Sequence, residues 1–112
     1  MTSLINSAQL DRFKDKPALV HRLIRIYLDM SPNMIAEIKS AASAGDIEQV
    51  GSKAHSLKGS SAELGAEQLA DISHQLQMAA RNGVEARIGP LIDELHDCHE
   101  KTVAALEELD PG

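Results

Sequence analysis

The amino-acid sequence predicts an all-α protein, an antiparallel four-helix bundle with an additional short N-terminal helix. Apolar residues recur at helical spacing along most of the chain, and no segment alternates apolar and polar residues over the length of a strand. The core must be aliphatic, because Phe13 and Tyr27 are the only Phe, Tyr or Trp residues among 112. Glycines and prolines divide the chain at intervals typical of packed helices with short loops. We therefore expect one domain over residues 1–112.

Helix signals before Gly45 predict three segments. A short helix covers Ser7 to Phe13, and Pro17 opens the next, because a proline at the first helical position loses no hydrogen bond. Ser31-Pro32 has the form of a cap followed by a proline, so we expect a new helix to begin there. The inward residues are predicted to be Leu19, Leu23, Ile26, Tyr27 and Met30 in the first long segment, and Met34, Ile35, Ile38 and Ala42 in the second.

Two helices joined by a tight turn follow. Asp46 caps the first, with Gln49 three residues later at the spacing of a capping box. This helix covers about Ile47 to Leu64 and ends at Gly65, and the second covers about Glu67 to Arg81. We expect them to form an antiparallel hairpin over about residues 46–81. Their inward stripes are predicted to be Ile47, Val50, Ala54, Leu57, Ser61 and Leu64 in the first helix, and Leu69, Ile72, Leu76 and Ala79 in the second.

The last helix is predicted to continue to about Leu109. Asn82-Gly83 separates it from the hairpin, and it begins either near Val84 or at Pro90. Pro90 would otherwise kink the helix, because proline lacks the N–H that a helix interior needs. The inward stripe is predicted to be Ile88, Leu91, Leu95, Cys98 or Thr102, Leu106 and Leu109.

Composition excludes several classes of protein. A formal net charge of −6 argues against a general nucleic-acid binder, which would need a basic surface. A single cysteine, Cys98, rules out an internal disulfide and fits a reducing compartment. The sequence contains no apolar stretch of membrane-spanning length, and Met-Thr-Ser-Leu lacks the pattern of a signal peptide. We therefore expect a cytoplasmic domain without direct membrane insertion, either free-standing or part of a longer membrane-anchored chain.

His55 is the strongest candidate for a functional residue. It lies in the middle of a predicted helix, with Gly51 one turn before it and Gly59 one turn after it. Glycine costs a helix interior roughly 1 kcal/mol relative to alanine, so two of them need a reason. At about 100° per residue, His55 falls roughly 130° from the centre of the inward stripe. We therefore expect the imidazole to face solvent or a shallow groove. The two glycines leave the surface beside it without covering side chains.

The neighbours of His55 are small or charged. Ser52 and Ala62 share its face, and Lys58 stands one turn away, between this face and the core. On the following helix, Gln77 lies at the margin of the inward stripe and could reach the first helix across the hairpin. Arg81 lies one turn beyond Gln77. Lys53 and Arg81 are candidates to complement an acidic partner, although each is equally explained as an ordinary surface charge.

Residues 54–66, Ala-His-Ser-Leu-Lys-Gly-Ser-Ser-Ala-Glu-Leu-Gly-Ala, resemble the signature of histidine phosphotransfer (HPt) domains. Leu69 and Leu76 follow at the positions that this signature continues, and Ala44-Gly45-Asp46 matches the break before the motif. The wider order of helices extends the resemblance to nearly the whole chain. The sequence departs from the pattern at Ser73, where many members carry cysteine, at a position that concerns packing rather than chemistry.

The resemblance implies a role for each matching residue. His55 matches the phospho-accepting histidine, and Lys58 matches the position that interacts with the phosphoryl group. Gly59 matches the small residue that permits close approach, and Gln77 matches a less specific position where some members carry a glutamine that hydrogen-bonds the ring. The partner-binding surface is expected to comprise Gly51, Ser52, Gly59, Ala62 and Arg81.

The resemblance implies a phosphorelay carrier that exchanges a phosphoryl group with the aspartate of a response-regulator receiver domain. Mg²⁺ is expected on that receiver domain, and a hybrid sensor histidine kinase is a further expected partner. The chain lacks a glycine-rich nucleotide loop and a carboxylate cluster suited to hold the metal. We therefore expect no cofactor, no bound metal and no kinase activity of its own. We also expect a monomer, because no apolar stripe is obviously left without a partner.

Three alternatives to a phosphorelay carrier remain. The nearby residues His96, Cys98, His99 and Glu100 suggest a metal site, but no matching ligand cluster is evident elsewhere, so we interpret these histidines as surface residues. An HPt-like module that docks a partner without obligatory phosphotransfer is the second alternative. A purely structural bundle is the third, and it would leave Gly51 and Gly59 unexplained.

Overall fold

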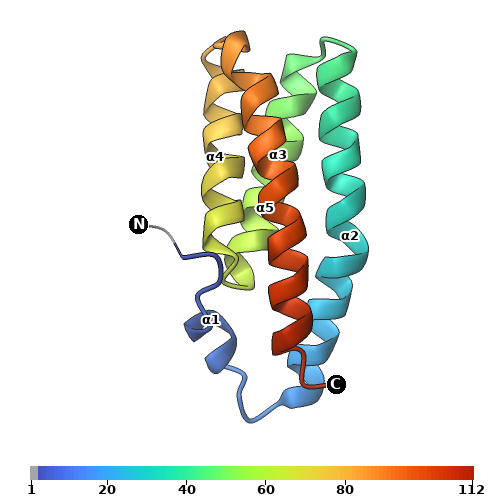
Figure 1. Cartoon of the computed structure of the whole chain (residues 1–112), viewed down its shortest axis with the longest axis vertical. Helices are drawn as coiled ribbons and strands as arrows, with labels where there is room; N and C mark the ends of the chain where they lie inside the picture. The colour runs from blue at the N-terminus through green and yellow to red at the C-terminus, as the bar shows by residue number, and fades with distance from the viewer. Residues whose placement is uncertain (1–2) are drawn as a thin grey trace.

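Four long helices form an antiparallel bundle in the computed structural model, which describes residues 3–112 (Figure 1). The bundle is an elongated rod with extents of 44 × 27 × 19 Å. The predicted all-α four-helix bundle with a short N-terminal helix is confirmed, and residues 3–112 contain no strand. In chain order the elements are α1 (Ala8–Asp11), α2 (Pro17–Ser43), α3 (Ile47–Glu63), α4 (Glu67–Arg81), the 3₁₀ turn η1 (Glu85–Arg87) and α5 (Ile88–Leu109).

The predicted helix break at Ser31-Pro32 is wrong, because α2 runs without interruption from Pro17 to Ser43. A proline inside a helix costs roughly 3 kcal/mol. Apolar residues on both sides of Pro32 share one buried face, and their burial outweighs that cost. Pro32 itself is exposed, and Ser31 is buried rather than acting as a cap.

The inward stripe of the first half of α2 lies one position later than predicted. The structure buries Val20, Ile24 and Tyr27, whereas Leu19, Leu23 and Met30 are only half-buried. Ile26 is 52% exposed, so its predicted place in the core is wrong. Apolar residues occupy both members of the pairs 19/20, 23/24 and 26/27, and the helical period alone could not decide which member faces inward.

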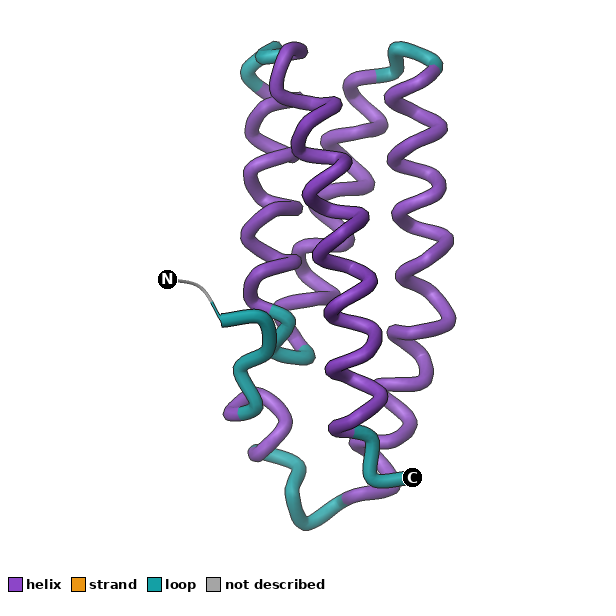
Figure 2. Tube along the Cα trace, in the orientation of Figure 1, coloured by secondary structure: helices purple, strands orange, loops and turns teal. Residues whose placement is uncertain are grey.

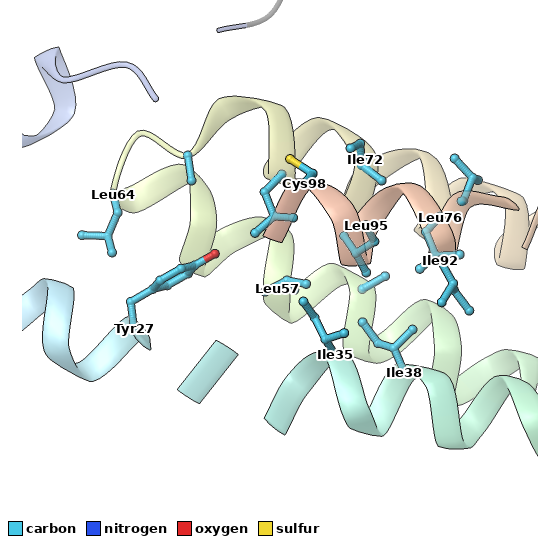
Figure 3. Close-up of a cluster of buried hydrophobic side chains, with 14 of the residues drawn as sticks. Tyr27, Ile35, Ile38, Leu57, Leu64, Ile72, Leu76, Ile92, Leu95 and Cys98 are labelled. Atoms are coloured by element: carbon cyan, nitrogen blue, oxygen red, sulfur yellow. The ribbon is translucent and has the colours of Figure 1, made fainter. Parts of the chain in front are cut away.

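The other helices contribute the core largely as predicted (Figure 3). In the figure, Leu57, Leu76 and Leu95 point into one cluster from α3, α4 and α5. α5 also buries Ile92, which was not predicted, while Leu109 is 41% exposed and does not belong to the core. The buried residues of these three helices are Val50, Ala54, Leu57 and Ser61 in α3, Leu69, Ile72, Ser73, Leu76 and Ala79 in α4, and Ile88, Leu91, Ile92, Leu95, Cys98, His99, Thr102 and Leu106 in α5.

The start of α5 resolves the ambiguity at Pro90. η1 precedes the helix, and α5 begins at Ile88, so Pro90 is its third residue. The first four N–H groups of a helix have no intrahelical partner, and a proline there removes no hydrogen bond. Pro90 therefore neither starts the helix nor needs to kink it.

His99 is a buried residue, which corrects its interpretation as a surface histidine. Its side chain is turned toward α2, where Nε2 lies 2.8 Å from Oγ of Ser31. Burial lowers the pKa of His99, because desolvation disfavours the charged ring. One turn earlier on the buried face of α2, Oη of Tyr27 lies 2.7 Å from Oγ of Ser61 in α3. Two polar contacts thus join α2 to its neighbours inside an otherwise apolar core.

The segment before α2 covers the turn between α3 and α4. The backbone N–H of Asn6 donates to the carbonyl oxygen of Gly65 at 2.6 Å, and Gln68 N–H at the start of α4 donates to the carbonyl oxygen of Ser3. The Asn6 side chain also donates to Glu67 Oε1 at 2.7 Å. α1 is shorter than the predicted helix over Ser7 to Phe13. Among residues 3–112, no helix combines the length and hydropathy that crossing a bilayer would require.

Replacement of Gly65 by alanine should destabilise the protein more than the same change at Gly83. Both glycines have a positive φ, which costs alanine about 1–2 kcal/mol. A Cβ at Gly65 would also collide with the backbone carbonyl of Asn6, whereas one at Gly83 would meet nothing within 4 Å. We expect Gly65→Ala to lower the free energy of unfolding by about 2 kcal/mol more than Gly83→Ala, as measured by urea denaturation, because hydrogen bonds of the N-terminal segment are lost. Equal losses would show that this segment does not stabilise the turn.

Candidate functional site

His55 lies in the middle of α3, on the side that faces α4, and its side chain is exposed. Nδ1 of the imidazole is 3.1 Å from Nε2 of Gln77, which is half-buried on α4. The ring is therefore held at Nδ1 by the neighbouring helix. Nε2 of His55 has no hydrogen-bond partner in residues 3–112.

Gly51 allows α4 to approach α3 closely beside this contact. A Cβ at Gly51 would lie 3.3 Å from Cβ of Ala80 and 3.9 Å from the carbonyl oxygen of Gln77. These values leave almost no room for a side chain between the helices. We expected Gly51 only to leave the imidazole uncovered. The structure shows that this glycine also allows α4, which carries Gln77, to lie close to His55.

Gly59 faces open space on the other side of His55. A Cβ built there would meet nothing within 4 Å, so no neighbouring residue requires glycine at this position. Its backbone is also helical, with no positive φ. Packing and backbone conformation thus both fail to explain Gly59, and the bare surface that it leaves remains its distinguishing feature.

A groove with a volume of about 530 Å³ lies between α3 and α4 beside the imidazole, and we call it the His55 groove. It brings together five predicted site residues, which are Gly51, Ser52, His55, Gln77 and Arg81. Sequence reasoning missed its other lining residues, Ile47, Glu48 and Ala80. Ala80 could have been found, since Gly51 and Ala80 are nearly equidistant from the Gly65 turn and small residues facing each other indicate closely packed helices.

Lys58 and Ala62 lie apart from that groove. They line a second depression of about 420 Å³ nearer the α3–α4 turn, which we call the Lys58 groove, together with Asp71 and His74 of α4. Lys53 is directed elsewhere, because its ammonium lies 3.0 Å from Glu37 of α2. Of the predicted partner-binding residues, Gly51, Ser52 and Arg81 therefore line the His55 groove and Ala62 lines the Lys58 groove. Gly59 lines neither groove, and Lys53 does not join them.

The residues of the metal-site alternative do not converge. Cys98 and His99 are buried, whereas the side chain of His96 is half-exposed and that of Glu100 is exposed. His96, Asp97 and Glu100 do offer ligand atoms within 4.8 Å of one another. However, Nδ1 of His96 is 2.9 Å from the Lys39 ammonium and Nε2 is 3.3 Å from Glu100. Both ring nitrogens are thus engaged, and the ammonium opposes a bound cation.

Comparisons with known proteins agree with this geometry. The family model of the Hpt domain matches residues 22–106, which is more than half of the chain. The fold is similar to the crystal structure of histidine-containing phosphotransfer protein B (HptB) from Pseudomonas aeruginosa PAO1. The two share 21% sequence identity, with 98% of this chain and 96% of that chain covered and a TM-score of 0.90. A comparison with curated protein sequences gives no match. The chain belongs to the Hpt domain family, whose members carry phosphoryl groups on histidine in phosphorelays.

Proposed function

We propose that this chain accepts a phosphoryl group on His55 and donates it again, exchanging it with the aspartate of a response-regulator receiver domain. The observation that carries the proposal is the exposed imidazole, held at Nδ1 by Gln77 at 3.1 Å. A ring held at one nitrogen presents the other in a fixed direction to a docking protein. The open surface at Gly59 supports the proposal, because a large partner must approach the ring closely.

The transfer requires a nucleophilic nitrogen in line with the phosphorus and its leaving group. The lone pair of His55 Nε2 attacks the phosphorus of the aspartyl phosphate. A nitrogen–phosphorus bond forms as the bond between phosphorus and the aspartate oxygen breaks, and the aspartate leaves as a carboxylate. Mg²⁺, if bound by the receiver domain, would supply charge neutralisation for the phosphoryl oxygens. The chain then needs no cofactor of its own for this step.

The amide of Gln77 selects the nitrogen that reacts. A nucleophilic Nε2 requires the neutral ring to carry its proton on Nδ1, and that N–H needs an acceptor. Oε1 of Gln77 is buried and has no hydrogen-bond partner in the described chain. Because a half-turn of an amide exchanges its oxygen and nitrogen within nearly the same volume, we assign the reactive state to the orientation in which Oε1 accepts from Nδ1–H of His55.

Cationic side chains on the same face suit an incoming phosphoryl group and an acidic partner. A phosphoryl group adds about −1.5 to −2 charge, which a nearby ammonium offsets. Lys58 is half-buried and lies one turn from His55. Arg81 is exposed at the His55 groove. We assign Lys58 to the phosphoryl group and Arg81 to the acidic surface around the receiver aspartate.

The receiver domain is proposed to dock over both grooves, with His55 between them. Ser52 in the His55 groove and Ala62 in the Lys58 groove are exposed residues. Their short side chains do not protrude from the α3–α4 face, so they would not obstruct a docking protein. A phosphorylated receiver, free or within a hybrid sensor histidine kinase, is the proposed donor, and an unphosphorylated receiver is the acceptor. The chain provides the nucleophile and the docking face, and the partner provides the metal.

Replacement of His55 by glutamine should abolish phosphotransfer. We expect the wild type, incubated with Mg²⁺ and phosphorylated receiver domains from the same genome, to acquire acid-labile, alkali-stable label. His55→Gln should acquire none, because the amide cannot form a phosphoimidazole. His96→Gln is the matched control, since the His96 side chain is 45% exposed on α5, lines neither groove and should keep wild-type labelling. Persistent label in His55→Gln, or no label in the wild type from any receiver domain, would exclude the proposal.

Replacement of Gly59 by leucine should slow transfer strongly while the bundle stays folded. The new side chain meets no neighbour, so it projects into the space that a docking receiver must enter. We expect a loss of at least about tenfold in the transfer rate, equivalent to about 1.4 kcal/mol, with an unchanged helical circular-dichroism spectrum. Gly89→Leu is the control, because Gly89 also faces open space but lies at the start of α5. Equal transfer rates for the two variants would contradict the access argument.

A further inference from the structure

α2 carries two parallel apolar stripes, of which the core uses one. Val20, Ile24 and Tyr27 belong to the buried stripe. One position before each of these residues, and before buried Ser31, lies a second stripe with spacings of four, three and four residues. We call it the outer stripe, and its members are Leu19, Leu23, Ile26 and Met30. Ile26 is 52% exposed, compared with 42% for Val84 and 41% for Leu109. Leu23 and Met30 reach the edge of the core, whereas Leu19 and Ile26 do not belong to it.

The length of α3 explains why no other helix covers the outer stripe. Tyr27 Oη lies 2.7 Å from Ser61 Oγ, so α3, which ends at Glu63, stops alongside the middle of α2. Figure 2 shows α2 continuing past the turn between α3 and α4. The part of α2 before Tyr27 therefore lacks the hairpin that covers its later turns. The expectation of a monomer rested on every apolar stripe having a partner, and this stripe removes that basis.

Two charges of opposite sign lie beside the stripe. Arg22 and Asp29 are seven residues apart, so they occupy the same flank of the helix, with Ile26 between them. Both are exposed, and neither forms an ion pair with another part of residues 3–112. The same segment of α2 thus presents the outer stripe, a positive charge before Ile26 and a negative charge after Ile26.

This arrangement is complementary to itself. When two identical helices pack antiparallel about a two-fold axis, each flank meets the same flank of the other copy. The register that sets Leu23 against Ile26 of the second copy also sets Leu19 against Met30. The same register places Arg22 beside Asp29 of the second copy, twice by symmetry. We propose that the outer stripe of α2 is a homodimer interface, in which two copies of this chain pair their α2 helices antiparallel about an axis that passes between Leu23 and Ile26.

The interface leaves the phosphotransfer site accessible. His55 contacts Gln77 on α4, whereas the side of α3 toward α2 carries Lys53 and Ser61. A second copy against the outer stripe would therefore lie away from the His55 groove. Because one face of one helix is a small contact, association should be weak and should depend on protein concentration. Each dimer would present two independent phosphoacceptor faces.

Sedimentation velocity of the wild-type chain tests the interface. Between roughly 1 µM and 1 mM, a range over which small interfaces associate, we expect the mass to rise from 12.1 kDa toward twice that value. Ile26→Glu should remain monomeric at every concentration, because it places two like charges near the centre of the proposed interface. Val84→Glu is the matched control, since it makes the same change at an exposed apolar residue near the α4–α5 turn, and it should dimerise like the wild type.

Charge reversal tests the antiparallel register. Arg22→Asp and Asp29→Arg should each weaken dimerisation at least about tenfold, and the double variant should restore it, because the two charges then exchange places. Circular dichroism should show the same helix content in every variant. A wild type that stays monomeric at all concentrations, a dimer that survives Ile26→Glu, or a double variant no better than the single ones would overturn the proposal.

Discussion

The close contact between α3 and α4 is the constraint on which the site depends. Gly51 lacks a side chain where Ala80 approaches, with only 3.3 Å between its would-be Cβ and that of Ala80. This approach brings Gln77 within 3.1 Å of the imidazole of His55. A Cβ at position 51 would require Ala80 and α4 to shift by a few tenths of an ångström away from α3. The site is thus built by helix packing, and the side chain that anchors the histidine, Gln77, comes from the neighbouring helix.

The rest of the bundle keeps this hairpin rigid without entering the site. α2 and α5 pack against it through aliphatic side chains and through the contact of Tyr27 with Ser61, and they are joined to each other by the contact of Ser31 with His99. The N-terminal segment covers the α3–α4 turn through hydrogen bonds to Gly65 and Gln68. These contacts lie in the core and at the turn, outside the exposed α3–α4 face that we propose as the docking surface. The outer stripe of α2 lies on a different side, so self-association and phosphotransfer need not compete.

Sequence reasoning succeeded where a pattern had one physical solution. The stripe of α4 has a single apolar arc, and its predicted bounds, Glu67 to Arg81, agree with the structure. The outward position of His55 followed in the same way from a complete inward stripe on α3. The sequence could not show which of two neighbouring apolar residues, Ile26 or Tyr27, faces the core. It also could not show that buried residues on both sides of Pro32 keep this proline within one continuous helix. The burial of His99 depends on Ser31, a partner far along the chain that no local pattern identifies. The contact of Gly51 with Ala80 follows only when the two helices are matched outward from the Gly65 turn.

The central claim is that Gln77 holds His55 by Nδ1 so that Nε2 faces outward as the nucleophile. Long-range ¹H–¹⁵N NMR spectra of the imidazole, recorded before and after treatment with phosphoramidate, test it without any receiver domain. The claim predicts a proton on Nδ1 of the neutral His55 ring beforehand and a phosphoryl group on Nε2 of His55 afterwards. Phosphorylation at Nδ1, or preferential phosphorylation of another histidine, would contradict it.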